Sequence, residues 1–212
     1  MTNFLVHQVF GPIFQAIYGW IGSYGISIIV FTVLIKILLL PLTIPQLNSM
    51  KMMKELQPKI AELQEKYKNN KEKLNAELLN LYKEHKYNPA SGCLPLIIQL
   101  PIIYALFYLF QKYPGFQGAS FLWVNNLAAP DKTYILPVIS AVTTYLSTIM
   151  VPSSKDQSQN MTYLMLSAFT LWISLKFPAG LVLYWTVGNL FQIIQQFIML
   201  RPVLFVKGES KR

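Results

Sequence analysis

Lys36 is the residue of this sequence whose type and position most require a chemical explanation. It is the first Lys, Arg, Asp or Glu in the chain, and it lies within a mainly apolar stretch from Ile26 to Leu40. An ammonium group near the middle of a bilayer costs from about 3 to more than 10 kcal/mol, depending on how far water and headgroups reach it. The position therefore indicates either a functional cation facing a wet cavity or a partner, or a long stem that snorkels to an interface.

Polar side chains also interrupt the later apolar runs, at the steps of three and four that place them on one helix face. The candidate sets are Trp185, Asn189, Gln192 and Gln196; Gln99, one turn from Ile103; and Thr144, Ser147 and Thr148. Each set could line a polar passage, or could hydrogen-bond between helices at about 0.6 kcal/mol per contact. Gln195 and Gln196 could also be interfacial residues.

Long apolar runs are the elements that would position these residues. With 53% hydrophobic and 13% charged residues and a mean hydropathy of +0.39, the chain is typical of a polytopic membrane protein. We expect an all-α fold with five transmembrane helices, at about 26–47, 93–111, 133–151, 161–176 and 179–200. The predicted organisation is an interfacial helix (1–24), a first span (25–49), a helical hairpin (50–91), spans two to five (92–200) and a short basic tail (201–212).

The distribution of basic residues predicts the orientation of these spans. Segments 48–92, 152–160 and 201–212 carry 9, 1 and 4 Lys and Arg, whereas the opposite side carries only Lys112, Lys132 and Lys176. By the positive-inside rule the amino terminus is outside and the carboxyl terminus is cytoplasmic. The net charge of +9 is explained by this topology, and we expect no direct nucleic-acid recognition.

The charged segment after the first span has the pattern of a coiled-coil hairpin. Met53, Leu56, Ile60, Leu63 and Tyr67 recur at steps of three and four, and a matching stripe, Leu74, Leu78, Leu81 and His85, follows the turn at Asn69-Asn70. Pro58 is expected to begin the first arm, because proline is tolerated in the first turn of a helix.

The segments on the outer side have simpler expectations. Gly11-Pro12 starts a short helix with Tyr18, Trp20 and Tyr24 at headgroup level, and Gly22 and Gly25 turn the chain into the membrane. In the loop 112–132, the aromatic residues Phe116, Phe121 and Trp123 are expected to be interfacial anchors.

The sequence offers no pattern for a metal, cofactor or nucleotide site. Cys93 is a single cysteine and is expected to pack at a helix start, and His7 and His85 lie far apart outside the spans. No glycine-rich phosphate loop is present in the sequence, so we expect no nucleotide hydrolysis.

Two motifs resemble the YidC/Oxa/Alb family of membrane protein insertases. The first comprises Asn88-Pro89, Gly92-Cys93-Leu94-Pro95, Gln99, Pro101 and Ile102; the second comprises Phe177-Pro178-Ala179-Gly180-Leu181, Leu183-Tyr184-Trp185, Asn189 and Gln195. Their order and spacing extend the resemblance over about residues 10 to 200. The chain is similar to the compact five-span form of Gram-positive-type bacteria.

This resemblance implies a cytoplasm-facing hydrophilic groove that receives hydrophobic segments with short polar outer tails and releases them into lipid. Lys36 takes the place of the family's basic residue, often Arg, and Tyr184 and Trp185 are expected to contact substrate. Ser147 or Thr148 stands where related chains carry glutamine, and Ile103 where they carry an aromatic residue. Nascent membrane proteins and lipids are the expected partners, with the ribosome and a Sec translocon as further candidates, at the bacterial cell membrane.

Two other classes of function remain open from the residues themselves. A transporter or channel would also place Lys in a wet span, although ion coupling usually uses intramembrane carboxylates and all nine acidic residues lie outside the predicted spans. An intramembrane enzyme would require a paired nucleophile and base or a metal set, which the sequence does not supply.

Overall fold

The computed structural model describes residues 5–85, 87, 94–150 and 157–205, which fold into helices joined by turns and one longer loop. The helices are η1 (Leu5–Phe10), α2 (Gly11–Ile21), α3 (Tyr24–Leu38), α4 (Leu40–Lys66), α5 (Lys71–Glu84), α6 (Leu94–Lys112), η3 (Pro114–Phe116), α7 (Ile135–Ile149), α8 (Gln157–Ser174) and α9 (Ala179–Phe205). For this part of the chain the prediction of an all-α protein is confirmed. The motif residues 88–93, including Cys93, and the end of the tail from 206 lie outside the described residues.

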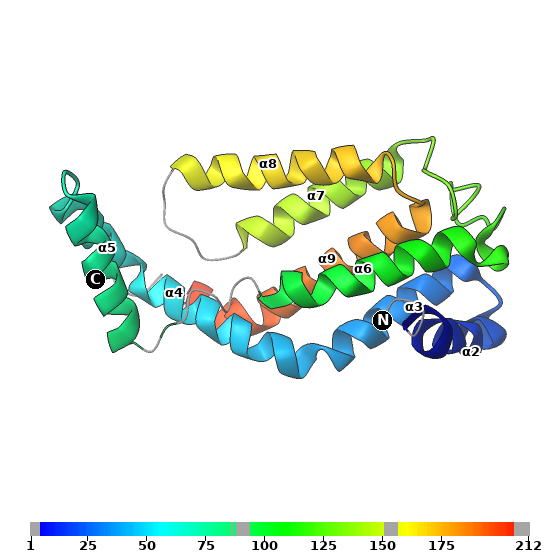
Figure 1. Ribbon diagram of the computed structural model, residues 1–212, viewed down its shortest axis with the longest axis horizontal. Helices are drawn as coiled ribbons and strands as arrows, with labels where there is room; N and C mark the ends of the chain where they lie inside the picture. Colours follow the sequence, from blue (N-terminus) through cyan, green and yellow to red (C-terminus); the bar gives the residue numbers. More distant parts are fainter. Residues whose placement is uncertain (1–4, 86, 88–93, 151–156, 206–212) are drawn as a thin grey trace.

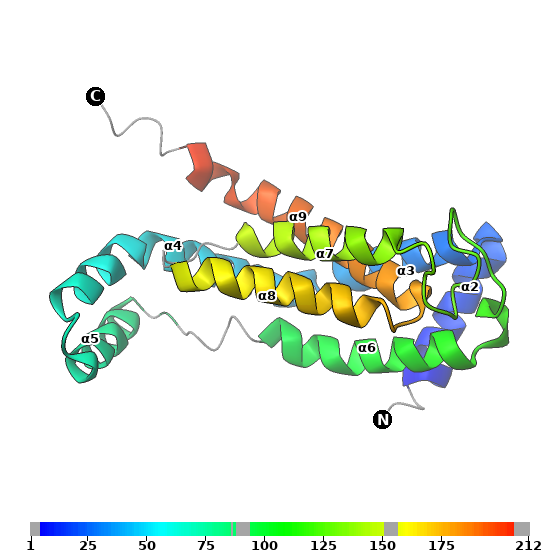
Figure 2. The same ribbon diagram turned by 90° about the horizontal axis from the view of Figure 1, so that it is seen from above.

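Helix α9 is the centre of a helical bundle. It packs against α3, α4, α6 and α7, and α8 packs on the far side of α7. Figure 1 shows these helices running along the long axis of the molecule, with α5 and the end of α4 at one end and α2 at the other. In Figure 2 α2 lies across the bundle instead of along it. The second half of the chain therefore supplies the helix on which the first half packs.

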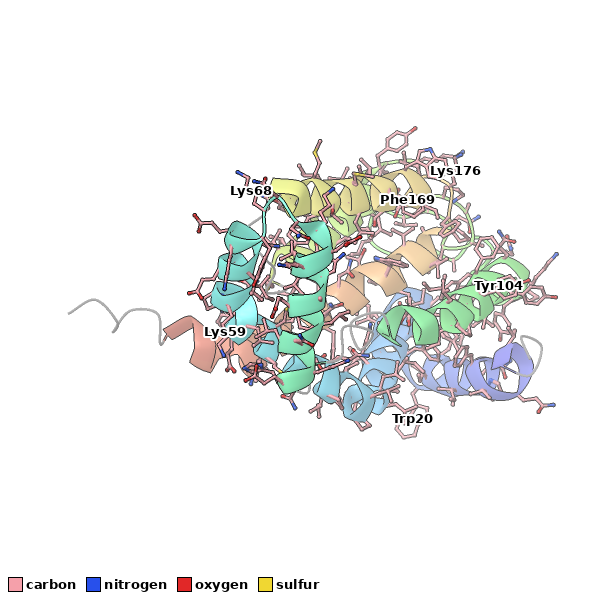
Figure 3. All side chains as sticks on the ribbon, turned by 60° about the vertical axis from the view of Figure 1, so that its left-hand side comes forward. Trp20, Lys59, Lys68, Tyr104, Phe169 and Lys176 are labelled. Carbon is pink, nitrogen blue, oxygen red and sulfur yellow. The ribbon has the colours of Figure 1, made fainter. Side chains whose placement is uncertain are left out.

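The outside of the bundle is apolar over much of its length. On α8, Met161, Met165, Phe169 and Trp172 follow one another at steps of four, four and three, and each is more than half exposed. At the end of this stripe the Lys176 ammonium lies 4.2 Å from the centroid of the Trp172 ring, and Figure 3 shows Lys176 at the outside of the molecule. A continuous exposed apolar stripe with a cation at its end is typical of a helix surrounded by lipid.

Fewer of the described helices are long and apolar enough to be spans than the five predicted from the sequence. Of the described helices, Ala179–Ile198 within α9 is long and apolar enough to cross a membrane, and α3 and α4 satisfy the same criteria when taken together. Helix α7 is apolar but shorter, at 15 residues. The prediction of five spans therefore remains a proposal.

The first predicted span, 25–49, is two helices instead of one. Helix α3 ends at Leu38 and α4 begins at Leu40, with a bend of 64° between the two axes. Leu39 keeps a helical conformation, and its amide still donates to the carbonyl of Ile35 at 3.0 Å. Proline in the first turn of α4 has no amide hydrogen to continue the α3 ladder, which gives a physical reason for the break.

The expectation that the hairpin helix begins at Pro58 is wrong. Helix α4 runs without interruption from Leu40 to Lys66 and contains both Pro45 and Pro58. Its far end packs on α5 around the buried side chains of Leu56, Ile60 and Leu81. Packing along this stripe outweighs the loss of one backbone hydrogen bond at each proline.

The turn between α4 and α5 agrees with the predicted asparagine turn. The Asn70 side chain accepts a hydrogen bond from the Lys73 amide at 3.0 Å and so caps the start of α5. Two residues of the predicted second stripe, Leu78 and Leu81, face α4, and His85 lies within 3.1 Å of the Lys59 ammonium. Figure 3 places Lys59 and Lys68 at this end of the molecule.

Glycines shape the start of α3 in a different way from that predicted. Gly22 has φ +71° and ends α2, as expected for a turn residue. Gly25 instead lies inside α3, where a β-carbon would overlap the ring of Phe121. The absence of a side chain at this position therefore lets the outer loop pack directly on the helix.

Aromatic packing joins α2, α3 and the outer loop. Phe116 is fully buried, with its ring centroid 4.9 Å from that of Phe14 and 5.0 Å from that of Tyr24. The prediction that Phe116 is an interfacial anchor is therefore wrong. Trp20 is 95% exposed and points away from the bundle in Figure 3, as expected for a residue at an interface.

Asp131 fixes the start of α7. Its carboxylate accepts hydrogen bonds from the Thr133 amide at 2.9 Å, the Thr133 hydroxyl at 2.7 Å and the Leu136 amide at 3.0 Å, and its side chain is buried. Burial raises the pKa of this carboxyl, but the hydrogen bonds from Thr133 and Leu136 outweigh it, so the pKa lies below its ordinary value. The bonds satisfy amides at the helix start.

Candidate functional site

Lys36 lies on the side of α3 that faces α9. A β-carbon built at Gly188 of α9 would stand 3.1 Å from Cε and 3.5 Å from Nζ of Lys36, so the end of the side chain rests on the α9 backbone. Lys36 is partly buried, and within the described residues it has no hydrogen bond or ion pair. An ammonium in this position is available to an acidic group that comes from outside the chain.

A network of polar side chains joins α7 to α9. The Trp185 indole donates to the Thr144 hydroxyl at 3.3 Å. Turning the Asn189 amide so that its oxygen faces Thr144 gives this oxygen hydrogen-bond donors: it then accepts from the Thr144 hydroxyl at 2.8 Å and from the Trp185 indole at 3.3 Å. Three of the predicted site residues thus meet in one place and hydrogen-bond with one another.

The other two predicted residues of α7 do not join this network. Ser147 donates to the Thr144 carbonyl at 2.9 Å, and Thr148 donates to the carbonyls of Thr144 and Tyr145 at 2.8 Å. Both hydroxyls therefore bond to the backbone of their own helix, a common arrangement for Ser and Thr in apolar surroundings.

Gln99 and Tyr184 connect α6 to α9. The Gln99 amide donates to the Tyr184 hydroxyl at 2.9 Å, and the Tyr184 side chain is 1% exposed. Ile103, one turn along α6 from Gln99, is partly buried and packs against the main hydrophobic cluster. Tyr184 is thus a buried link between helices in this structure.

The three glutamines toward the end of α9 differ in their surroundings, and one of them bonds to α4. Gln195 donates to the Thr43 hydroxyl at 3.0 Å, while Gln192 is partly buried and has no hydrogen bond within the described residues. Gln196 is fully buried, and neither atom of its amide meets a partner in the described part of the chain. The interfacial interpretation is therefore wrong for Gln196.

Two residues of this region were not predicted from the sequence. The hydroxyl oxygen of Thr143 lies 3.3 Å from the end of the Asn189 side-chain amide, and Gly188 lies next to the end of the Lys36 side chain. Nothing in the sequence pattern distinguishes Thr143 from its neighbour Thr144. Gly188 could have been predicted, because a glycine inside an apolar helix is unfavourable unless another element approaches closely.

The described residues form no metal site. In the described residues no three His, Cys, Asp or Glu side chains gather closely enough to bind a metal ion. A cavity of about 230 Å³ lies instead between the first helices and the end of α6, lined in part by Val6, Gln15, Leu109 and Lys112.

Exposed apolar faces, polar links between helices and a partly buried cation define a helical integral membrane protein. The family model described as the 60Kd inner membrane protein matches residues 16–205. The chain therefore belongs to this family, the YidC/Oxa/Alb membrane protein insertases, and the resemblance noted in the sequence is confirmed.

Individual relatives agree with this assignment. The chain is 48% identical over 200 residues to the membrane protein insertase YidC of Caldanaerobacter subterraneus subsp. tengcongensis, covering 94% of this chain and 96% of the relative. The chain is also 45% identical over 217 residues to YidC of Clostridium perfringens, covering 93% of this chain and 91% of that relative. YidC of Geobacter sulfurreducens is 42% identical over 187 residues, which cover 88% of this chain but 35% of that longer protein.

A solved structure also resembles this fold. The crystal structure of an active YidC insertase with its first transmembrane domain resolved superposes with a TM-score of 0.74 at 30% sequence identity. The match covers 89% of this chain and 45% of the other, so this chain spans less than half the length of that protein. Together the comparisons identify a membrane protein insertase of the bacterial plasma membrane.

Proposed function

We propose that this insertase receives hydrophobic segments with short polar outer tails in a hydrophilic groove that opens to the cytoplasm and sideways to lipid. The observation that carries the proposal is the partly buried Lys36, held against Gly188 and without a partner in the described residues. A cation kept in this position can attract an acidic tail into the membrane.

The physical barrier to insertion is the transfer of the polar tail through hydrocarbon. Each unsatisfied backbone group costs several kcal/mol in the dry core of the bilayer. A wet groove that reaches partway across shortens the dry path. The apolar segment then partitions into lipid, favoured by about 25 cal/mol per Å² of buried apolar surface. These steps involve no covalent chemistry and no nucleotide hydrolysis.

We assign the groove to the faces of α3, α6, α7 and α9 that carry the polar residues. The proposed groove residues are Lys36, Gln99, Ile103, Thr144, Ser147, Thr148, Tyr184, Trp185, Asn189 and Gln192. Their observed contacts suggest a division of roles. Lys36 and Gln192 have polar groups free in the described part of the chain, whereas the bonded pairs such as Gln99 and Tyr184 hold the helices that form the walls.

The proposed topology has five spans, with the amino terminus outside and the carboxyl terminus in the cytoplasm. The α4–α5 hairpin then projects into the cytoplasm, where it is a candidate contact for substrates, the ribosome or a Sec translocon. The 14 Lys and Arg residues on the proposed cytoplasmic side support this orientation.

Site-specific photocrosslinking to a stalled nascent chain tests the groove directly. A photoreactive residue at position 36 is expected to crosslink to the acidic tail of the substrate. The matched control is position 34, because Leu34 lies two residues earlier on α3 and is 48% exposed on another face. Equal crosslinking from positions 34 and 36 would remove Lys36 from the substrate path.

A further inference from the structure

Gly188 makes room for the charged end of Lys36. Among the described glycines, it is the one at which an added β-carbon would meet a cationic side chain, at 3.1 Å from Cε and 3.5 Å from Nζ. Gly188 itself is buried within α9. Any larger residue at this position would therefore compete with Lys36 for the same space.

The other glycines show that this contact is specific. A β-carbon at Gly180, two turns earlier on α9, would instead lie 3.2 Å from the Leu127 carbonyl oxygen. At Gly19 it would meet nothing within 4 Å. Gly180 thus serves close packing of a loop on the helix, and Gly19 provides an unconstrained reference position.

The cost of glycine gives this contact further weight. Glycine inside a helix is about 1 kcal/mol less favourable than alanine, and its usual use within membranes is to let two helix backbones approach. Here the group that approaches is the end of a long cationic side chain. Because the Lys36 stem is flexible, an alanine could be accommodated by a small shift, whereas a leucine would displace the ammonium.

We propose that Gly188 is a positioning residue for Lys36: it holds the ammonium against α9 and thereby determines how well the groove receives acidic tails. This inference rests on the proposed function of Lys36. If a cation about 4 Å from a carboxylate moves about 1 Å farther away, their electrostatic attraction weakens. At the effective dielectric constant of a protein surface, this loss lowers the binding constant roughly fourfold.

Insertion assays with two matched substrates test the proposal. The substrates share one hydrophobic segment and differ only in whether the outer tail is acidic or neutral. Gly188→Ala is expected to lower insertion of the acidic-tail substrate by up to about fourfold, and Gly188→Leu by roughly tenfold or more, because the displacement is larger. Both variants are expected to lower neutral-tail insertion less than acidic-tail insertion, because a neutral tail does not depend on the position of the ammonium.

Control variants separate positioning from packing. Gly180→Ala, which crowds a backbone carbonyl, is expected to lower thermal stability without changing the ratio of acidic-tail to neutral-tail insertion. Gly19→Ala is expected to change neither property. Equal loss on both substrates in Gly188→Leu would show that Gly188 only packs helices, and no loss on either would also overturn the proposal.

Charge reversal at position 36 shows whether Gly188 alone lacks its proposed role or Lys36 lacks its role as well. If Lys36→Glu abolishes acidic-tail insertion and Gly188→Leu does not affect it, only the positioning role is rejected. If Lys36→Glu inserts both substrates normally, the proposed function of Lys36 is rejected, and the role of Gly188 with it.

Discussion

The Gln99 amide of α6 donates a hydrogen bond to the hydroxyl of Tyr184 of α9 across 2.9 Å, and Tyr184 is almost fully buried. The two residues are 85 positions apart in the sequence, so the bond joins helices from different halves of the chain. In an apolar bundle, a polar link of this kind constrains how the two helices lie against each other.

Removing the hydroxyl tests whether this link supports the fold or contacts substrate. Tyr184→Phe is expected to destabilise the protein by about 1 kcal/mol, because the Gln99 amide loses its acceptor. Thermal unfolding in detergent measures this change. Gln99→Leu combined with Tyr184→Phe is expected to recover part of the stability. Unchanged stability together with lost insertion would instead indicate direct contact with substrate.

Reversing the charge at position 36 tests the central electrostatic proposal. Lys36→Glu is expected to lower insertion of acidic-tail substrates by at least about tenfold, because repulsion replaces attraction at short range. Lys36→Arg keeps the charge and is expected to retain insertion. The assay is complementation in a strain depleted of its own insertase.

The control for this prediction is Lys132→Glu, which makes the same change of charge at an exposed position of the loop before α7. It is expected to insert substrates like the parent protein. If Lys36→Glu complemented as well as Lys36→Arg and the control variant, Lys36 would have no part in the mechanism.

Shortening the hairpin between Pro58 and Tyr87 is expected to reduce insertion more than it reduces stability. The hairpin has its own small cluster around Leu56, Ile60 and Leu81, separate from the main hydrophobic cluster of the bundle. Growth of a depletion strain and thermal unfolding in detergent measure the two properties. Normal growth with the shortened hairpin would exclude a role in capturing substrate or ribosome.

Asp131 is expected to make stability depend on pH. Hydrogen bonds from Thr133 and Leu136 hold its pKa below the ordinary value despite burial. A group with a depressed folded-state pKa stabilises the protein above its unfolded-state pKa, about 4, and this contribution is lost as the pH falls through the folded-state pKa. Thermal unfolding measured at pH values from roughly 2 to 7 covers this range.

Substitution identifies the contribution of this carboxylate. Asp131→Ala is expected to lower stability by about 1–3 kcal/mol at neutral pH, because buried amides at the start of α7 lose their acceptor. The destabilising effect is expected to shrink toward acidic pH. An effect that stayed constant down to the lowest pH would show that charge on Asp131 is not what stabilises the helix.

The sequence by itself determined the class of protein and most of its helical content. Apolar runs long enough for spans, the steps of three and four from Met53 through Leu56 and Ile60 to Leu63, and the turn at Asn70 are local patterns. Backbone hydrogen bonding within a helix is local as well. The two motifs around Gln99 and Tyr184 similarly indicated the family before any contact was known.

Only the tertiary structure decided how these parts meet. The passage of α4 through Pro58, the burial of Phe116 and the contact between Lys36 and Gly188 each depend on packing between segments that are separated in the sequence. Helical periodicity states which residues share a face, but it does not state which other helix that face will touch. That choice is made by the fit of side chains in three dimensions.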